Sequence, residues 1–113
     1  MTLPGLPPAS KNTRRLVREL AAKAHERELA VALGHLHDAF AAWRDGRIGA
    51  FELNERIHRF HNGPSRDLYN TYSEVDPAML VAHAVVSGVL SESEIPVEVL
   101  EYIEVPLAFY RRR

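Results

Sequence analysis

The hydrophobic and polar positions of this chain follow the period of α-helices. Leu29, Leu33, Leu36, Phe40 and Trp43 recur at alternating spacings of four and three, which places them on one stripe of a helix. Alanine, leucine, arginine and glutamate dominate the surrounding sequence, and all four favour helix. We therefore predict a first helix over residues 13–44, roughly 48 Å long at 1.5 Å per residue.

Glycine and proline divide the middle of the chain. Gly46 and Gly49 predict the end of the first helix, because glycine readily takes the left-handed conformation of a helix C-terminus. A second helix is predicted over residues 50–61, antiparallel to the first because the connection is short. Asn62-Gly63-Pro64 predicts a stop, and a third helix then covers residues 65–74. The inward side chains predicted for these two helices are Phe51, Leu53, Ile57, Phe60, Leu68, Tyr69 and Tyr72.

The last third of the chain predicts a buried helix and a broken one. Residues 77–90 are apolar nearly all round, which is typical of a central helix, and His83 is expected to be a neutral core histidine. Pro106 lies inside the final helical pattern, where it must break the backbone ladder near residues 102–105. The predicted fold is a compact all-α bundle of about five helices. A single domain over residues 13–113 follows a flexible leader over residues 1–12.

Composition narrows the possible chemistry. The 113 residues contain no cysteine, which excludes disulfides, thiolate zinc sites and a cysteine nucleophile, and which fits the cytoplasm. The longest apolar run is too short to span a bilayer, and the first ten residues lack the pattern of a signal peptide, so no membrane partner is expected. Residues 1–66 hold 11 Lys and Arg against 7 Asp and Glu, whereas residues 67–113 hold 3 against 8. The two halves can attract each other within one chain or between two; a basic face for nucleic acid is the alternative.

Hydrogen-bond donors gather around the predicted start of the third helix. They are Arg56, His58, Arg59, Asn62, Ser65 and Arg66. Donors beside a helix N-terminus predict an anion pocket for phosphate or a carboxylate. In the alternative interpretation, the arginines pair with nearby carboxylates and Asn62 caps the helix.

The segment Arg56-Ile57-His58-Arg59-Phe60-His61 separates an arginine from a histidine by four residues. This spacing resembles the signature of the HEPN ribonucleases, small all-helical proteins that often dimerise to pair two such motifs. The resemblance implies that Arg56 binds phosphate and that His61 serves as acid or base in cutting RNA. The chain departs from that signature at Ile57, where a polar residue is usual, and in placing the motif mid-chain.

Histidines on the two predicted hairpin helices are candidate metal ligands. His58 and His61 can meet His35 or His37 across an antiparallel hairpin, and three imidazoles suit zinc or another transition metal. Glu55 and His58 have the spacing of a ligand pair in helical di-iron bundles, although no second such pair exists. Exposed or hydrogen-bonded surface histidines are the alternative, and no cofactor is expected.

Two functional hypotheses follow from these patterns. The first is a non-enzymatic protein-interaction or regulatory module that acts as a homodimer through its first helix, which is longer than a compact domain needs. A different protein partner is also compatible with it. The second is a small hydrolase, either a HEPN-like ribonuclease or a metal-dependent enzyme, centred on Arg56, His58 and His61.

Overall fold

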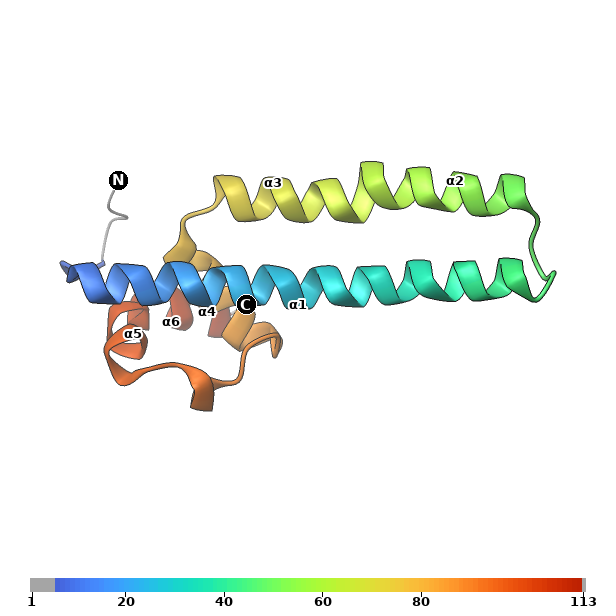
Figure 1. The fold of residues 1–113 in the computed structure, drawn as a ribbon. Coiled ribbons are helices and arrows are strands. Elements are labelled where there is room, and N and C mark those ends of the chain that lie inside the picture. The colour runs from blue at the N-terminus through green and yellow to red at the C-terminus, as the bar shows by residue number, and fades with distance from the viewer. Residues whose placement is uncertain (1–5, 113) are drawn as a thin grey trace.

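A computed structural model describes residues 6–112, which form helices joined by short connections (Figure 1). The α-helices are α1 (Lys11–Arg44), α2 (Ala50–Phe60), α3 (Arg66–Glu74), α4 (Pro77–Ser87), α5 (Val97–Tyr102) and α6 (Glu104–Arg111). A π-helical turn, η1 (His61–Ser65), and a 3-10 turn, η2 (Glu92–Glu94), complete the described chain. The all-α prediction is confirmed, since residues 6–112 contain no strand.

The start of α1 is fixed by a side-chain cap. Ser10 precedes the helix, and its hydroxyl accepts a hydrogen bond from the amide of Thr13 at 3.0 Å. This satisfies one of the amides that have no partner within the first turn. The helix therefore begins at Lys11, slightly before the predicted start. Most of the predicted leader precedes this point; residues 1–5 lie outside the described part, whereas Leu6 packs against the core.

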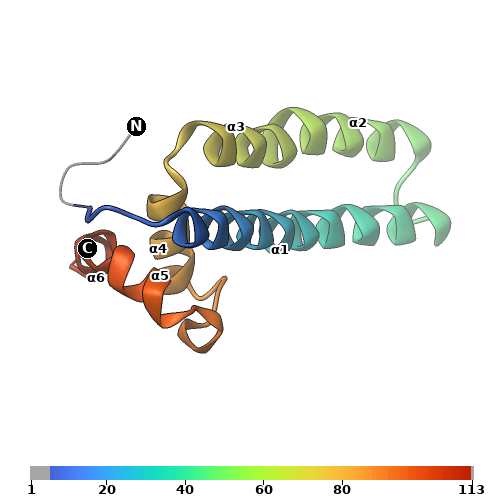
Figure 2. The same cartoon turned by 60° about the vertical axis from the view of Figure 1, so that its left-hand side comes forward.

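The hydrophobic core lies at one end of the molecule, where α4 and α5 pack on the N-terminal half of α1 and α6 packs on α4 and α5 (Figures 1 and 2). The largest fully buried side chains are Val81, Leu90, Val99 and Ile103. The predicted burial of α4 is confirmed for most of its length. His83 is the exception: it is exposed, and its ring lies at 74° to the ring of Tyr110, with the centroids 5.1 Å apart. The core-histidine prediction was wrong because α4 packs against α1 and α6 and leaves this side of the helix open.

Proline breaks the last helix as predicted. α5 ends at Tyr102 and α6 begins at Glu104, with Ile103 between them at φ −95° and ψ 13°. Pro106 sits in the first turn of α6, where its missing amide hydrogen is tolerated. Both Pro106 and Leu107 are buried, so the break turns α6 back onto α4.

The molecule is elongated, measuring 55 × 28 × 27 Å. α2 and α3 run back along α1 in the opposite direction (Figures 1 and 2). Because the core lies only along the N-terminal half of α1, the second half of α1 and α2 project beyond it. We call residues 29–60 the distal hairpin. This projection makes the helical bundle longer than the compact shape that we predicted.

The helix does not stop at Asn62-Gly63-Pro64, as the sequence had indicated. The backbone stays helical from Ala50 to Glu74, and η1 carries it through the proline. A proline ring inside a regular α-helix collides with the carbonyl four residues before it, and the wider π turn relieves that conflict. The predicted third helix is therefore a continuation of the second.

Candidate functional site

The α1 side of its contact with α2 in the distal hairpin is made by small side chains. Ala39 and Ala42 of α1 are buried there, together with Leu53 of α2. Alanine lets two helices approach closely but covers little of the surface on either side. The larger side chains of the α1 stripe consequently stay open: Leu33 is 46% exposed, Phe40 39% and Trp43 44%.

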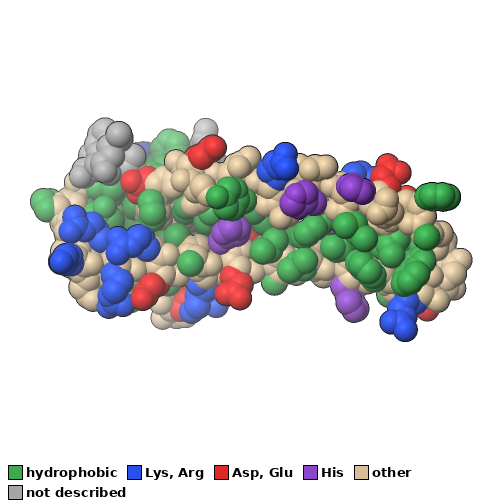
Figure 3. All heavy atoms as spheres, turned by 45° about the horizontal axis from the view of Figure 1, so that its top comes forward, with side chains coloured by type: hydrophobic (Ala, Val, Ile, Leu, Met, Phe, Trp, Pro, Cys, Tyr) green, Lys and Arg blue, Asp and Glu red, His purple; other side chains and the backbone are tan. Residues whose placement is uncertain are grey.

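These three side chains and Ile57 of α2 define the apolar band. Figure 3 shows hydrophobic side chains gathered along this face of the hairpin, with histidines beside them. His61 lies four residues after Ile57, and His37 lies four residues after Leu33, so both belong to the band side of their helices. The predicted inward position of Phe51 was wrong, since it is 94% exposed near the hairpin tip. Tyr69, also predicted to face inward, is exposed as well.

A groove of about 820 Å³ lies between α1 and the continuous α2–η1–α3 helix. Its lining comes from α1 (Glu28, Val31, Ala32, His35, Leu36 and Ala39), from the opposing helix (Arg56, Arg59, Phe60, Pro64, Asp67 and Leu68) and from Val89 after α4. Arg56 and Arg59 lie three residues apart on one side of α2, whereas Ile57 is rotated from Arg56 by about 100°. The groove and the apolar band thus flank the helix contact from different sides.

The charged groups of the groove have dissimilar partners. Arg56 reaches Glu52 at 3.5 Å, and Arg59 reaches Glu52 and Glu55 at 3.6 Å, all on α2. Exposed pairs of this kind within one helix add little stability. Glu28, in contrast, accepts a hydrogen bond of 2.6 Å from the hydroxyl of Tyr72.

Tyr72 is held from two sides at the core end of the groove. Its ring stacks on His25 with centroids 4.6 Å apart and an interplanar angle of 4°. Burial and the neighbouring Glu28 carboxylate raise the pKa of Tyr72, so its hydroxyl remains a donor. This contact ties α3 to α1 and fixes the register of the two helices.

The residues of the predicted anion pocket separate. Arg56 and Arg59 line the groove, whereas His58, Asn62 and Arg66 are exposed and do not line it. Ser65, the remaining member, is half-buried inside the continuous helix. The amide of Arg66 donates to the carbonyl of Gly63, so the helix start on which the prediction rested is missing.

The two residues of the ribonuclease-like spacing point in different directions. Positions five apart on an α-helix differ by about 140° around its axis. Arg56 accordingly lines the groove, while His61 is exposed and is absent from that lining. A single copy therefore does not bring the two side chains to one phosphate-sized space.

The candidate metal ligands are likewise dispersed. His35 lines the groove, His37 lies 4.0 Å from Asp38, and Glu55 contacts Arg59. Within residues 6–112, no group of three or more histidine or acidic side chains is arranged to hold a metal ion. His58 and His61 are both exposed on α2 and η1.

Sequence reasoning missed most of the groove. The groove brings together residues from three segments that are distant in the sequence: Glu28, Asp67 with Leu68, and Val89. The predicted stop at Pro64 left the position of the segment with Asp67 and Leu68 relative to the first helix undetermined. One feature of the sequence did indicate an irregular helix. If a regular α-helix continued through Pro64, Leu68 and Tyr72 would lie on a different side of it from Leu53 and Phe60. A one-residue π insertion brings them back toward α1.

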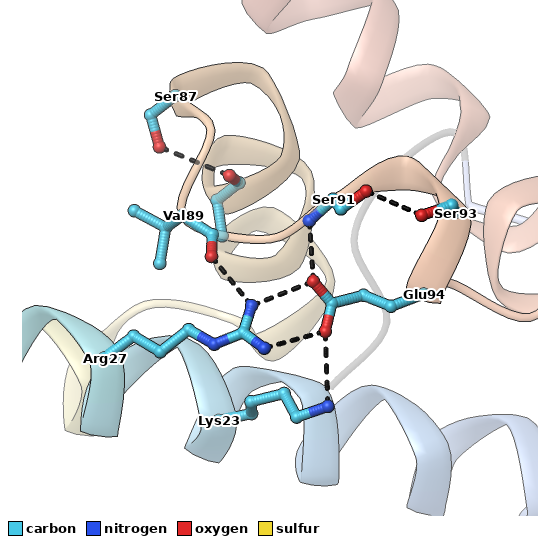
Figure 4. A network of polar contacts seen from close by, with 8 residues as sticks. Lys23, Arg27, Ser87, Val89, Ser91, Ser93 and Glu94 are labelled. Atoms are coloured by element: carbon cyan, nitrogen blue, oxygen red, sulfur yellow. Dashed lines mark hydrogen bonds and ion pairs between the residues drawn. The ribbon is translucent and has the colours of Figure 1, made fainter.

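A polar cluster around Glu94 holds η2 against α1 (Figure 4). The Glu94 carboxylate accepts hydrogen bonds from Arg27 at 2.8 and 2.9 Å, from Lys23 at 3.2 Å and from the Ser91 amide at 2.7 Å. Arg27 also donates to the carbonyl of Val89 at 2.9 Å. The bonds from Arg27 and Ser91 lower the pKa of Glu94 to about 2, because they favour the charged form of the carboxyl group. The charged carboxylate thus holds η2 against α1.

Replacing Glu94 by glutamine should remove a pH-dependent part of the stability. A lowered folded-state pKa stabilises the protein above the usual carboxyl pKa of 4.5, and this contribution disappears as the pH falls through about 2. Thermal unfolding of both proteins should therefore show the largest difference in Tm at pH 7 and a shrinking one between pH 4.5 and 2. Glu101→Gln, at an exposed site on α5, is the control. A difference for Glu94→Gln that does not change with pH would contradict the role assigned to this carboxylate.

Within residues 6–112, none of the helices combines the length and the apolar composition that a membrane-spanning helix requires. Comparison with known proteins finds no matching family model, no matching curated protein and no matching solved structure.

Proposed function

We propose that this protein is a non-enzymatic interaction or regulatory module that acts as a homodimer, joined through the apolar band. The observation that carries the proposal is the exposure of Leu33, Phe40 and Trp43 on a hairpin of only two helices. Large apolar side chains gathered on one exposed face are typical of protein–protein contacts. The hydrolase alternative gains no such support, because Arg56 and His61 face different sides of their helix.

A second copy of the chain is the partner that best suits the band. The α1 stripe has the alternating spacing with which helices interlock side chains. Two hairpins placed face to face about a two-fold axis would form four helices around a shared core, a stable arrangement for helices of this length. The side chains beside the band include histidines. They are compatible with an interface, because the residues that the centres of interfaces generally avoid are lysine and glutamate.

Sedimentation velocity on the wild type and on Phe40→Glu tests the proposal. The wild type should pass from monomer to dimer as its concentration rises. The substitution should weaken the dimer by about 30-fold or more, since central aromatic side chains contribute about 2 kcal/mol or more to interfaces. Trp43, the only tryptophan, gives a second readout: its emission should shift to shorter wavelength on dimerisation.

Val31→Glu is the matched control, because Val31 is 64% exposed on the same helix but lies at the groove. It should dimerise like the wild type. A wild type that stays monomeric at every concentration would overturn the homodimer. An equal loss in Val31→Glu and Phe40→Glu would remove the band as its interface.

A further inference from the structure

The groove offers a long apolar surface, of which only Ala39 also belongs to the contact between α1 and α2. Along α1 it extends from Glu28 to Ala39, a distance of roughly 16 Å at 1.5 Å per residue. Leu36 on α1 and Phe60 and Leu68 on the opposing helix contribute its largest aliphatic and aromatic side chains. Its volume of about 820 Å³ falls in the range of small-molecule sites.

The charges of the groove divide between its two ends. α1 and α2–α3 run antiparallel, and Tyr72 meets Glu28, so residues near 68 lie at the core end and residues near 56 at the distal end. The core end therefore carries Glu28 and Asp67. The distal end carries the guanidinium groups of Arg56 and Arg59.

The two arginines can bind a carboxylate from outside the protein while losing only weak contacts with Glu52 and Glu55. Both contacts of Arg59, with Glu52 and Glu55, are 3.6 Å and so exceed hydrogen-bonding distance. The single contact of Arg56 with Glu52 is at the 3.5 Å limit. A guanidinium presents a planar fork of donors that matches a carboxylate, and two guanidiniums one helical turn apart can share one anion.

We propose that the groove binds a fatty carboxylate, an unbranched hydrocarbon chain ending in one carboxylate group. The carboxylate lies against Arg56 and Arg59, and the hydrocarbon chain runs over Leu36, Phe60 and Leu68 toward Val89. Asp67 at the core end repels the carboxylate and so fixes the orientation of the ligand. The site goes beyond the proposed self-association, because Arg56 and Arg59 lie on a different side of α2 from Ile57 of the apolar band.

Isothermal titration with sodium dodecanoate, kept below its micellar concentration, tests the proposal. One molecule should bind each chain. Dodecyltrimethylammonium, with a chain of the same length and the opposite charge, should bind at least tenfold more weakly. Decanoate and octanoate should follow in order, each removed CH2 weakening binding by up to about fourfold.

Two double variants separate the role of the groove arginines from that of net charge. Arg56→Gln with Arg59→Gln should weaken dodecanoate binding at least tenfold. Arg44→Gln with Arg66→Gln removes the same charge from exposed positions outside the groove and should bind within twofold of the wild type. Phe40→Glu should also bind normally, which keeps this test independent of dimerisation through the band.

Three results would each overturn the proposal. One is the absence of saturable dodecanoate binding, as expected if the groove takes only a protein helix. Another is equal affinity for the anionic and cationic amphiphiles. The third is equal binding by the two double variants. None of these results would bear on whether Phe40→Glu dissociates a dimer.

Discussion

Replacing Ile103 by alanine is expected to lower the free energy of unfolding by about 2–5 kcal/mol. The Ile103 side chain is fully buried at the junction of α5 and α6. Truncating it leaves a cavity, because the surrounding helices are fixed by their own hydrogen bonds. The backbone of Ile103 contributes two of these, donating to Val99 and accepting from Leu107, each at 2.9 Å. A loss of this size is a large part of the 5–15 kcal/mol that holds a typical domain together.

Urea unfolding followed by circular dichroism measures this loss. Val105→Ala is the matched control, since Val105 lies two residues away and is 52% exposed. Its free energy of unfolding should stay within about 0.5 kcal/mol of the wild type. If Ile103→Ala changed stability as little as Val105→Ala, the core could not be centred where α5 and α6 meet.

The two prolines inside helical segments show why sequence predicts one break and not the other. At Pro106, the helix breaks where the rule that proline interrupts a helix predicts the break. Ile103 leaves the helical conformation there, and its side chain is buried. At Pro64, tertiary contacts outweighed the local rule. Leu68 lines the groove and Tyr72 bonds to Glu28 from a helix that η1 carries past the proline. The sequence around Pro64 does not show whether the proline or the tertiary contacts will decide the backbone conformation.

The candidate site divides in a similar way. The stripe from Leu29 to Trp43 was visible as a period, and the structure shows that much of it remains exposed in the single chain. Its partner cannot be deduced from a period, because the alanines that close the contact between α1 and α2 look like ordinary helix formers. The groove required the register of two distant segments, which Glu28 and Tyr72 set across 44 residues.

Replacing Pro64 by alanine is expected to stabilise the hairpin by about 1–2 kcal/mol while leaving the π turn in place. Proline inside a helix is about 3 kcal/mol less favourable than alanine, and η1 already relieves part of that conflict. Alanine also gives the unfolded chain more conformational entropy, which reduces the gain in stability by about 0.4–1 kcal/mol. Trp43 emission during urea unfolding reports on the hairpin directly, since this residue lies near its tip.

The π turn should survive because packing, rather than proline alone, selects it. Conversion to a regular α-helix would rotate everything after Ser65 by about 100°. That rotation would withdraw Leu68 from the groove and break the Tyr72 bond to Glu28. Hydrogen exchange of the amides from 60 to 68, together with the Tyr72 ring signals, should therefore keep the wild-type pattern. If the Tyr72 signals instead moved to those of an exposed ring, proline would be the cause of the π turn, and the register of the whole groove would depend on that one residue.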